Sequence, residues 1–171
     1  MKTMLAGICF LYLCGCIGHP KMVTPVQDFE LNRYLGKWYE IARLDHSFER
    51  GLERVTAEYS LREGGGILVK NRGYSTAKDT WKEVEGKAVF ARDPTQGYLK
   101  VSFFGPFYGS YIVFELDKAN YQYAFVSGPN ESYLWFLSRT PTVSEELLAL
   151  FVEKAQALSF KTDDLIHVNQ R

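Results

Sequence analysis

The chain has 171 residues, of which 46% are hydrophobic and 15% are aromatic. This length is enough for one domain with a sizeable core and too short for two comfortable ones. Basic and acidic residues number 20 each, which gives a formal net charge of +0 without a basic patch, so we expect no nucleic-acid partner.

An apolar run from Met4 to Cys14 follows the single positive charge at the start of the chain. The run is too short to span a bilayer as a helix and is typical of the hydrophobic region of a secretory signal peptide. It ends in Leu13-Cys14-Gly15-Cys16, which resembles the lipobox of bacterial lipoproteins. This resemblance implies removal of residues 1–15 and attachment of lipid to Cys16. The alternative is a plain secretory signal with incidental cysteines.

The sequence after the signal peptide indicates a tether and then one domain. All three cysteines lie at or before position 16, so the domain has no pair that could form a disulfide. Residues 16–27 are expected to form the lipidated N-terminus and tether, and residues 28–171 the domain. In the lipoproteins that this start resembles, Asp after the lipidated cysteine causes retention in the inner membrane. Ile17 therefore favours the outer membrane, with the domain anchored on its periplasmic face.

Residues 36–42 are apolar on both faces of the strand that they predict. Tyr39 and Ile41 share one parity, while Trp38 and Ala42 share the other. A strand that is apolar on both faces needs cover on both. We expect one face to line a barrel interior and the other to lie under a helix; an ordinary sandwich strand is the alternative.

Further strands are predicted between turn signals rich in Gly, Pro, Asp and Asn. Their ranges are 55–61, 67–74, 81–91, 98–104, 107–116, 121–126 and 133–138, with a short last strand at 164–168. Mostly short connections favour an up-and-down barrel over a Greek-key sandwich, and closure removes exposed strand edges. The polar loop 45–52 contains aromatic residues and is longer than a hairpin turn, so it is a candidate lid for a cavity.

One helix is expected between the last two strands. Its start has two candidate N-caps, Thr142 and Ser144, and Thr142 with Glu145 fits a capping box. Apolar residues then recur at helical spacing, namely Leu147, Leu148, Phe151, Ala155 and Leu158. This stripe is predicted to cover Tyr39 and Ile41 from outside the barrel.

Three short motifs resemble regions shared by lipocalins: Gly36-x-Trp38-Tyr39, then Leu116-Asp117 before Tyr121, then Arg139 after Trp135-Phe136-Leu137. The likeness runs from about Leu31 to the C-terminus. Together with the lipobox, it resembles bacterial lipocalins of the outer-membrane lipoprotein type, and it is similar to apolipoprotein D.

The resemblance implies an all-β fold, an eight-stranded up-and-down antiparallel β-barrel with one C-terminal α-helix packed outside. In that family a Trp and an Arg stack at the closed end of the barrel. Gly36, Trp38 and Arg139 would have this structural role here. The usual Thr-Asp-Tyr of the family is replaced by residues 116–118, with the tyrosine shifted to Tyr121.

Strand parity taken from the resemblance gives a set of inward residues. The expected ligand-binding residues are Ala57, Tyr59, Val69, Asn71, Ala88, Phe90, Val101, Phe103, Tyr111, Val113 and Trp135, with Phe48 and Leu52 at the mouth. Further inward positions are Val84, Ala124, Val126 and Tyr133. Small residues leave room, aromatic residues form an apolar wall, and Tyr and Asn add polar groups, which suits an apolar chain with a polar head. The alternative is that these side chains fill the lumen.

The family and the lipid anchor together imply that the protein binds, stores or transports fatty acids or lysophospholipids for outer-membrane lipid maintenance or repair. The alternative function is an envelope lipoprotein with a filled barrel, which binds proteins through its outer surface. Homodimers occur among the relatives that the chain resembles, and the sequence leaves this state open.

Nothing in the sequence indicates catalysis. It contains no nucleophile-elbow, zinc-protease or phosphate-loop motif, so no catalytic residues and no cofactors are expected. His19, His46 and His167 lie apart, without a neighbouring ligand at metal-binding spacing, so no metal is expected. Parity points Glu40 and Glu115 inward, as candidate general bases or as carboxylates paired with Arg or Tyr near a barrel end.

Overall fold

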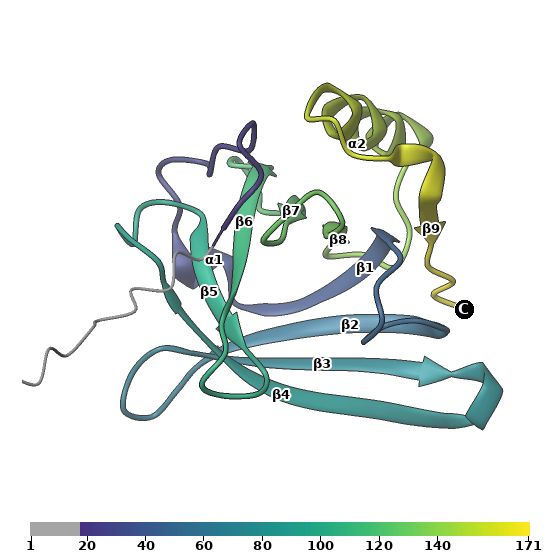
Figure 1. Ribbon diagram of the computed structural model, residues 1–171, viewed down its shortest axis with the longest axis horizontal. Coiled ribbons are helices and arrows are strands. Elements are labelled where there is room, and N and C mark those ends of the chain that lie inside the picture. Colours follow the sequence, from purple (N-terminus) through teal and green to yellow (C-terminus); the bar gives the residue numbers. More distant parts are fainter. Residues whose placement is uncertain (1–17) are drawn as a thin grey trace, which may run out of the picture.

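The computed structural model describes residues 18–171 (Figure 1), so the predictions for residues 1–15 and for the lipid on Cys16 lie outside the described residues. The strands are β1 (Gly36–Leu44), β2 (Leu52–Leu61), β3 (Ile67–Ser75), β4 (Thr80–Phe90), β5 (Tyr98–Ser102), β6 (Gly109–Leu116), β7 (Tyr123–Ser127), β8 (Leu134–Ser138) and β9 (Leu165–His167). The helices are α1 (Leu31–Tyr34) and α2 (Glu145–Ala157), with 3-10 turns η1 (Thr76–Lys78) and η2 (Thr162–Asp164). Within residues 18–171, no helix combines the length and the apolar character needed to cross a membrane.

Eight strands close into an antiparallel barrel. Each strand from β2 to β7 pairs with the next one along the chain, and β1 pairs with both β2 and β8. The short β9 pairs with Ala42–Leu44 of β1, beyond the residues of β1 that pair with β2. This arrangement confirms the predicted up-and-down barrel, in which closure leaves the eight barrel strands with neighbours on both sides.

Helix α2 packs on the outside of the barrel over β7 and β8 (Figure 1). The Phe151 ring lies 4.9 Å from that of Phe125 and 5.1 Å from that of Phe136, measured between centroids. Burial of a side chain of this size contributes about 1.5–3 kcal/mol. The predicted outer helix is confirmed, and Ile41 belongs to the same buried cluster.

The start of α2 shows which of the two candidate residues caps the helix. Ser144 is the N-cap, and its Oγ accepts a hydrogen bond from the backbone N–H of Leu147. Thr142 lies before the helix, where its carbonyl accepts a bond from the Thr140 hydroxyl. The capping box predicted at Thr142 was therefore wrong, because a cap must bond to the N–H groups of the first turn that lack helical partners.

Two β-bulges correct the predicted parity. In β1 the pairing with β8 shifts between Glu40 and Ala42, and Ala42 lies in the outer cluster instead of the lumen. In β6 the pairing with β7 shifts between Val113 and Glu115. The Glu115 carboxylate lies 2.6 Å from Lys154 Nζ on α2, so its predicted inward direction was wrong. A bulge adds one residue to a strand and reverses the alternation beyond it.

The closed end is sealed by a ring and a guanidinium. The Arg139 guanidinium carbon lies 3.8 Å from the centre of the Trp38 ring. Arg139 also donates to the carbonyls of Lys37 at 2.8 Å, Arg33 at 2.8 Å and Leu35 at 2.9 Å. These contacts join α1, β1 and the end of β8, so the lumen is blocked here and any cavity has to open at the other end.

Candidate functional site

Two adjoining cavities lie in the open half of the barrel. The inner cavity has a volume of about 250 Å³ and the outer cavity about 380 Å³. Both are lined by Phe48, Glu49, Val55, Asn71 and Phe103. Since they share these walls, an elongated ligand could occupy both.

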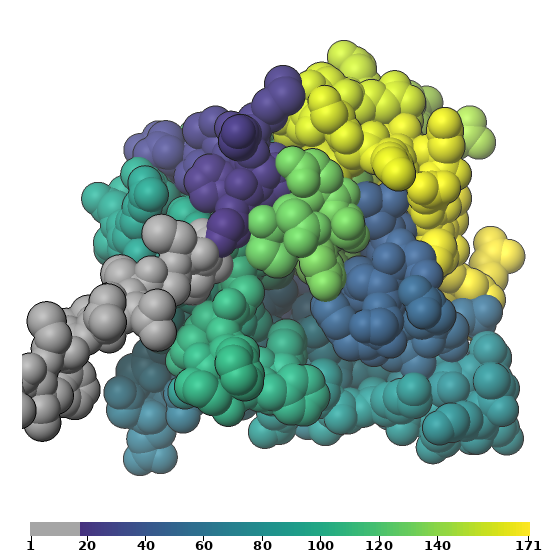
Figure 2. Space-filling model, in the orientation of Figure 1, coloured from purple at the N-terminus to yellow at the C-terminus, as the bar shows by residue number. Residues whose placement is uncertain are grey.

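The outer cavity lies beside a gap in the strand pairing. The eleven-residue β4 pairs with β5 only over Lys87–Phe90, because β5 has five residues. The loop between β5 and β6 covers this side, and its Phe104 and Phe107 are 76% and 78% exposed. Both rings line the outer cavity, and Figure 2 shows a hollow in the surface beside this loop. The opening therefore has an apolar rim.

Most of the predicted ligand-binding residues meet at these cavities. Those that line the inner cavity are Phe48, Ala57, Tyr59, Val69, Asn71, Val101, Phe103, Tyr111 and Trp135, together with the inward residue Tyr133. Leu52 and Val84 line the outer cavity. The remainder pack in the inner core and line neither cavity: Ala88, Phe90, Val113, Ala124 and Val126. Near the closed end the lumen is filled by other side chains, such as Phe29, whose ring lies 6.3 Å from that of Phe90.

Gly86 on β4 makes room for one cavity wall. A Cβ at this position would lie 2.6 Å from Cδ1 of Phe103 and 2.7 Å from the carbonyl oxygen of Ser102. Glycine thus lets the Phe103 ring lie directly against the β4 backbone, where it lines both cavities.

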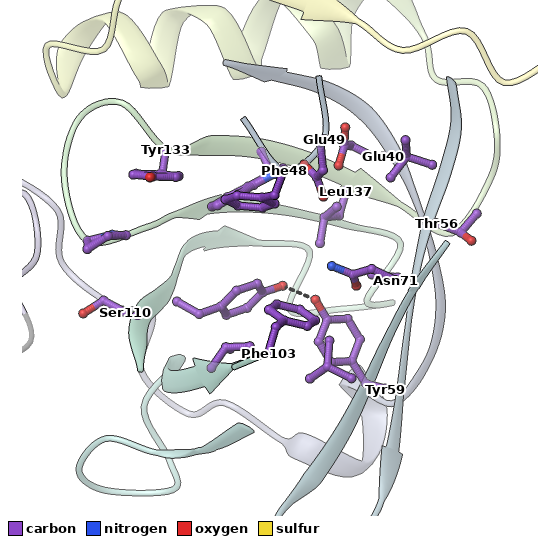
Figure 3. Close-up of a pocket in the computed structure, with 18 residues that line it drawn as sticks. Glu40, Phe48, Glu49, Thr56, Tyr59, Asn71, Phe103, Ser110, Tyr133 and Leu137 are labelled. Carbon is purple, nitrogen blue, oxygen red and sulfur yellow. Dashed lines mark hydrogen bonds between the residues drawn. The ribbon is translucent and has the colours of Figure 1, made fainter. Parts of the chain in front are cut away.

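Three tyrosine hydroxyls form a chain at the base of the inner cavity. The Tyr111 hydroxyl lies 2.6 Å from that of Tyr34. It also lies 2.8 Å from that of Tyr59 (Figure 3). Tyr34 is fully buried and also packs on Trp38, with 4.8 Å between ring centroids. Burial raises the pKa of all three phenols, so they remain neutral hydrogen-bond donors around neutral pH.

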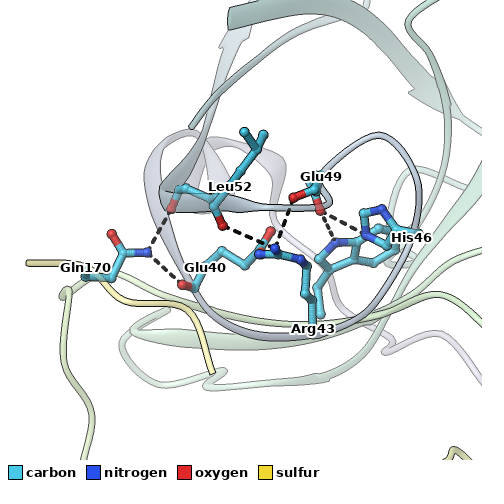
Figure 4. Close-up of polar contacts among 8 residues, drawn as sticks. Glu40, Arg43, His46, Glu49, Leu52 and Gln170 are labelled. Carbon is cyan, nitrogen blue, oxygen red and sulfur yellow. Dashed lines mark hydrogen bonds and ion pairs between the residues drawn. The ribbon is translucent and has the colours of Figure 1, made fainter. Parts of the chain in front are cut away.

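Glu40, Arg43, His46 and Glu49 form a buried ionic cluster (Figure 4). Its Glu40 and Glu49 lie across the inner cavity from Tyr59 (Figure 3). Arg43 is 1% exposed; it donates to the Glu40 carboxylate at 2.6 Å and to the carbonyls of Glu49 and Leu52 at 3.0 and 3.2 Å. Burial raises the pKa of the Glu40 carboxyl well above its usual range, with a further rise from the nearby Glu49 charge. Glu40 is thus a paired carboxylate, which is the second of the two roles that the sequence left open.

Glu49 joins this cluster to the loop at the mouth. Its carboxylate accepts a bond from Trp135 Nε1 at 3.0 Å and lies 2.9 Å from His46 Nε2. Burial acts to raise the pKa of Glu49, but the contacts with His46, Trp135 and Arg43 outweigh it and lower this pKa. The Phe48 ring lies 4.0 Å from the His46 ring. Contacts of His46 with Phe48 and Glu49 therefore hold the loop that was predicted as a lid.

The sequence alone did not indicate that these residues form one site. Glu49 and His46 lie in a loop, where strand parity gives no direction for a side chain. The only available signal was the single charged residue in the apolar run Ile41-Ala42-Arg43-Leu44, which places an arginine within a buried strand. Gln170, near the C-terminus, also contributes by donating to the carbonyls of Glu40 and Val55 at 2.7 and 3.0 Å.

Across residues 18–171, no group of three or more His, Cys, Asp or Glu side chains is arranged to hold a metal ion. The polar groups of the site are instead the hydroxyl chain, the Asn71 amide and the ionic cluster. Together with apolar walls, these groups suit binding of an apolar molecule that carries a few polar atoms.

Comparison with known proteins identifies relatives along the whole chain. The chain is 63% identical to a Vibrio cholerae protein named outer membrane lipoprotein Blc, over 171 residues and 100% of both chains. It is 52% identical to the Escherichia coli protein of the same name over 157 residues, covering 92% of this chain and 88% of the relative. Bovine apolipoprotein D is 34% identical over 139 residues, covering 77% of this chain and 70% of the relative.

The fold comparison agrees with these relatives. The structure of insecticyanin from the tobacco hornworm Manduca sexta has a TM-score of 0.70 at 24% identity, covering 89% of this chain and 86% of that chain, and supports the fold alone. The profile of the lipocalin-like domain matches residues 29–170. The chain therefore belongs to the lipocalin-like domain family.

Proposed function

We propose that the protein binds fatty acids or lysophospholipids in its barrel and stores or transports them for outer-membrane lipid maintenance or repair. The observation that carries this proposal is the pair of adjoining cavities with apolar walls and an apolar rim. Transfer of an acyl chain from water into such walls contributes about 25 cal/mol per Å² of buried apolar area. The role is one of binding, without chemical conversion.

The size and lining of the cavities support an elongated apolar ligand. Small-molecule sites typically measure about 300–1,000 Å³, and the outer cavity alone lies within this range. At its edge, Arg72, Lys82 and Glu83 offer charges to a polar head group. A filled barrel that binds only proteins has less support, because the inner cavity occupies the lumen.

The outer-membrane location rests on the relatives and on the start of the chain. The relatives from V. cholerae and E. coli are named outer membrane lipoproteins. In this proposal residues 1–15 are removed, Cys16 carries the lipid on the periplasmic face, and residues 16–27 are the tether to the domain.

One contact supports a short path between the anchor and the cavity. The Ser110 hydroxyl donates to the Gly18 carbonyl at 2.7 Å, and Ser110 lines the inner cavity. A lipid on Cys16 would thus hold the open half of the barrel near the membrane from which ligands come. The homodimer stays a prediction.

A titration with a fluorescent lysophospholipid tests ligand binding. Purified unlipidated protein should give a saturable signal that palmitic acid competes away. Val69→Phe, which fills part of the inner cavity, should weaken binding at least fivefold. Its control is Val89→Phe, the same change at an exposed position on β4 outside the lining of both cavities. A signal that does not saturate, or equal affinity in both variants, would end this proposal.

The anchor has its own test. Mass spectrometry of the protein purified from bacterial membranes should show a chain that begins at Cys16 and carries acyl groups. Cys16→Ser should move the protein from the membrane fraction to the soluble fraction. An unmodified Cys16 in a membrane-bound protein would contradict this part of the proposal.

A further inference from the structure

Asn71 carries an amide that lacks a protein partner. Its side chain lines both cavities and makes no hydrogen bond within residues 18–171, and its Oδ1 is buried from solvent. Its cross-strand neighbours are Ala57 on β2 and Val84 on β4, which have no polar side-chain atoms. Buried polar atoms are nearly always paired, because an unpaired one loses its bonds to water without replacement. The Asn71 amide is therefore set for a partner from outside the chain.

The hydroxyl chain beside Asn71 has one O–H donor that the chain itself does not use. Tyr34, Tyr59 and Tyr111 carry three O–H protons but share two hydrogen bonds. Tyr34 is fully buried and has only Tyr111 as a hydroxyl partner within the described residues, so its proton belongs in that bond. The unused donor then lies on Tyr59 or Tyr111, and both line the inner cavity.

These groups face the same space. Figure 3 shows the Asn71 amide and the Tyr59 hydroxyl directed into the cavity from neighbouring strands. β2 and β3 pair there, with Ala57 opposite Asn71 and Tyr59 opposite Val69. The cavity thus offers a free O–H donor next to an amide that can both donate and accept.

The charges nearby determine which acceptor fits. Glu40 and Glu49 line the same inner cavity, and Arg43, the cation paired with Glu40, does not line it. An ionised carboxylate would approach two acidic groups in a poorly solvated space, which is unfavourable. An uncharged carbonyl oxygen avoids this repulsion and still accepts from the hydroxyl and from the amide N–H.

We propose that Asn71, Tyr59 and Tyr111 form a binding site for the uncharged carbonyl of an acyl chain. The tyrosine hydroxyl and Asn71 Nδ2 donate to the carbonyl oxygen, and Asn71 Oδ1 accepts from an O–H close to that carbonyl. A lysophospholipid ester with its free glycerol hydroxyl provides both groups, and so does a protonated fatty acid. This inference rests on the proposed function, since it names the atoms by which the same cavity selects its lipid.

Matched ligands test the site. Palmitoyl lysophosphatidylcholine and its hexadecyl ether analogue differ at the carbonyl, so their affinities are compared below their micellar concentrations by competition with the fluorescent probe. The ester should bind about tenfold more tightly than the ether, as expected for the loss of one or two hydrogen bonds. Palmitic acid, measured at pH 5 and pH 8, reports whether a free acid uses the same groups.

Two variants locate the effect. Asn71→Leu should bring the ester and ether affinities within about twofold of each other, and it should not lower the melting temperature, because the amide has no protein partner to lose. Tyr111→Phe should do the same to the affinities but should lower the melting temperature, because Tyr34 and Tyr59 lose their partner. Tyr123→Phe, outside the cavities on β7, removes a hydroxyl as a matched control and should keep the tenfold preference.

The outcomes separate this inference from the proposed function. Lipid binding without a preference for ester over ether, and without an effect of Asn71→Leu on palmitic acid, would overturn the carbonyl site and leave the carrier role intact. If Asn71→Leu weakened the binding of palmitic acid while ester and ether bound equally well, the site would be assigned to free acids. Absence of saturable binding for every lipid would overturn both proposals.

Discussion

The two ends of the barrel each provide hydrogen-bond partners for one arginine, but in different ways. At the closed end, Arg139 is partly exposed and donates to five backbone carbonyls while it stacks on Trp38. At the open half, Arg43 is 1% exposed and pairs with the carboxylate of Glu40. Carbonyl dipoles suffice where water still reaches the guanidinium, whereas a fully buried guanidinium requires a counter-charge.

The difference also concerns what each arginine connects. The carbonyl partners of Arg139 on α1 and β1 lie more than 100 positions away in the chain, so Arg139 joins distant elements into a closed end. The partners of Arg43 lie within nine positions of it, so it shapes one loop at the mouth. Arg139 therefore stabilises the closure of the barrel, and the buried ionic cluster around Arg43 sets the shape of the cavity entrance.

The largest effect is expected when the buried ion pair is broken. Arg43→Ala leaves Glu40 buried without its cation and should lower the free energy of unfolding by about 3–5 kcal/mol. Urea denaturation measures this loss. The double variant Arg43→Met with Glu40→Leu should recover at least half of it, because it removes both charges. A double variant as unstable as the single one would show that the lost carbonyl bonds of Arg43, and not the charge, dominate.

A smaller loss is expected at the closed end. Arg139→Ala removes the stack on Trp38 and the bonds to the carbonyls, which should cost about 2–3 kcal/mol of unfolding free energy. Arg139→Lys should recover less than half of this, because an ammonium lacks the planar fork that reaches several carbonyls. Urea denaturation of the two variants is the measurement. Full recovery by lysine would mean that the charge alone matters.

The two carboxylates of the buried ionic cluster, Glu40 and Glu49, should affect the pH dependence of stability in opposite directions. The folded state lowers the pKa of Glu49, so its contribution is present above the unfolded value of about 4.3 and is lost as the pH falls. Glu49→Gln should therefore make the decline in unfolding free energy between pH 6 and pH 3 shallower. Urea denaturation across this range gives the slope.

Glu40 provides the opposite control for this slope. Its pKa is raised in the folded state, so its contribution is present at low pH and is lost as the pH rises through the folded value. Glu40→Gln should make the decline on acidification steeper. Equal slopes in both variants would contradict the opposite shifts.

The smallest change in stability is expected at the rim. Phe48 is 54% exposed, so Phe48→Ala should change the free energy of unfolding by less than about 1 kcal/mol. The same variant should release the fluorescent lysophospholipid about threefold to tenfold faster, because dissociation carries most effects of contact loss. Stopped-flow dissociation measures this rate. Leu61→Ala, at the far end of β2 and 62% exposed, should leave it unchanged.

The fold was largely predictable because its signals are local. Turn residues at short intervals marked the strands, and the helical stripe through Phe151 marked α2. The errors in side-chain direction occurred where one residue was added to a strand. Ala42 and Glu115 follow the bulges in β1 and β6, and a bulge leaves no sequence signal comparable with strand alternation.

The candidate site was predictable only in part. Parity brought Tyr59, Asn71 and Tyr111 to the lumen, but it could not show that the lower lumen is filled or that Glu49 joins the wall from a loop. The depth of a cavity depends on how side chains from every strand meet, and no single stretch of sequence contains that information.

The sequence by itself determined the order of the strands and the outer helix, which depend on residue types at short, regular spacing. The residues that seal the closed end were expected from the resemblance to lipocalins. Only the tertiary structure decided the direction of side chains beyond the two bulges, the pairing of Arg43 with Glu40, and the unused hydroxyl donor beside Asn71. The bulges and the hydroxyl chain depend on contacts between segments far apart in the chain. The pair of Arg43 and Glu40 is local in sequence, but it depends on the burial of both side chains in the closed barrel.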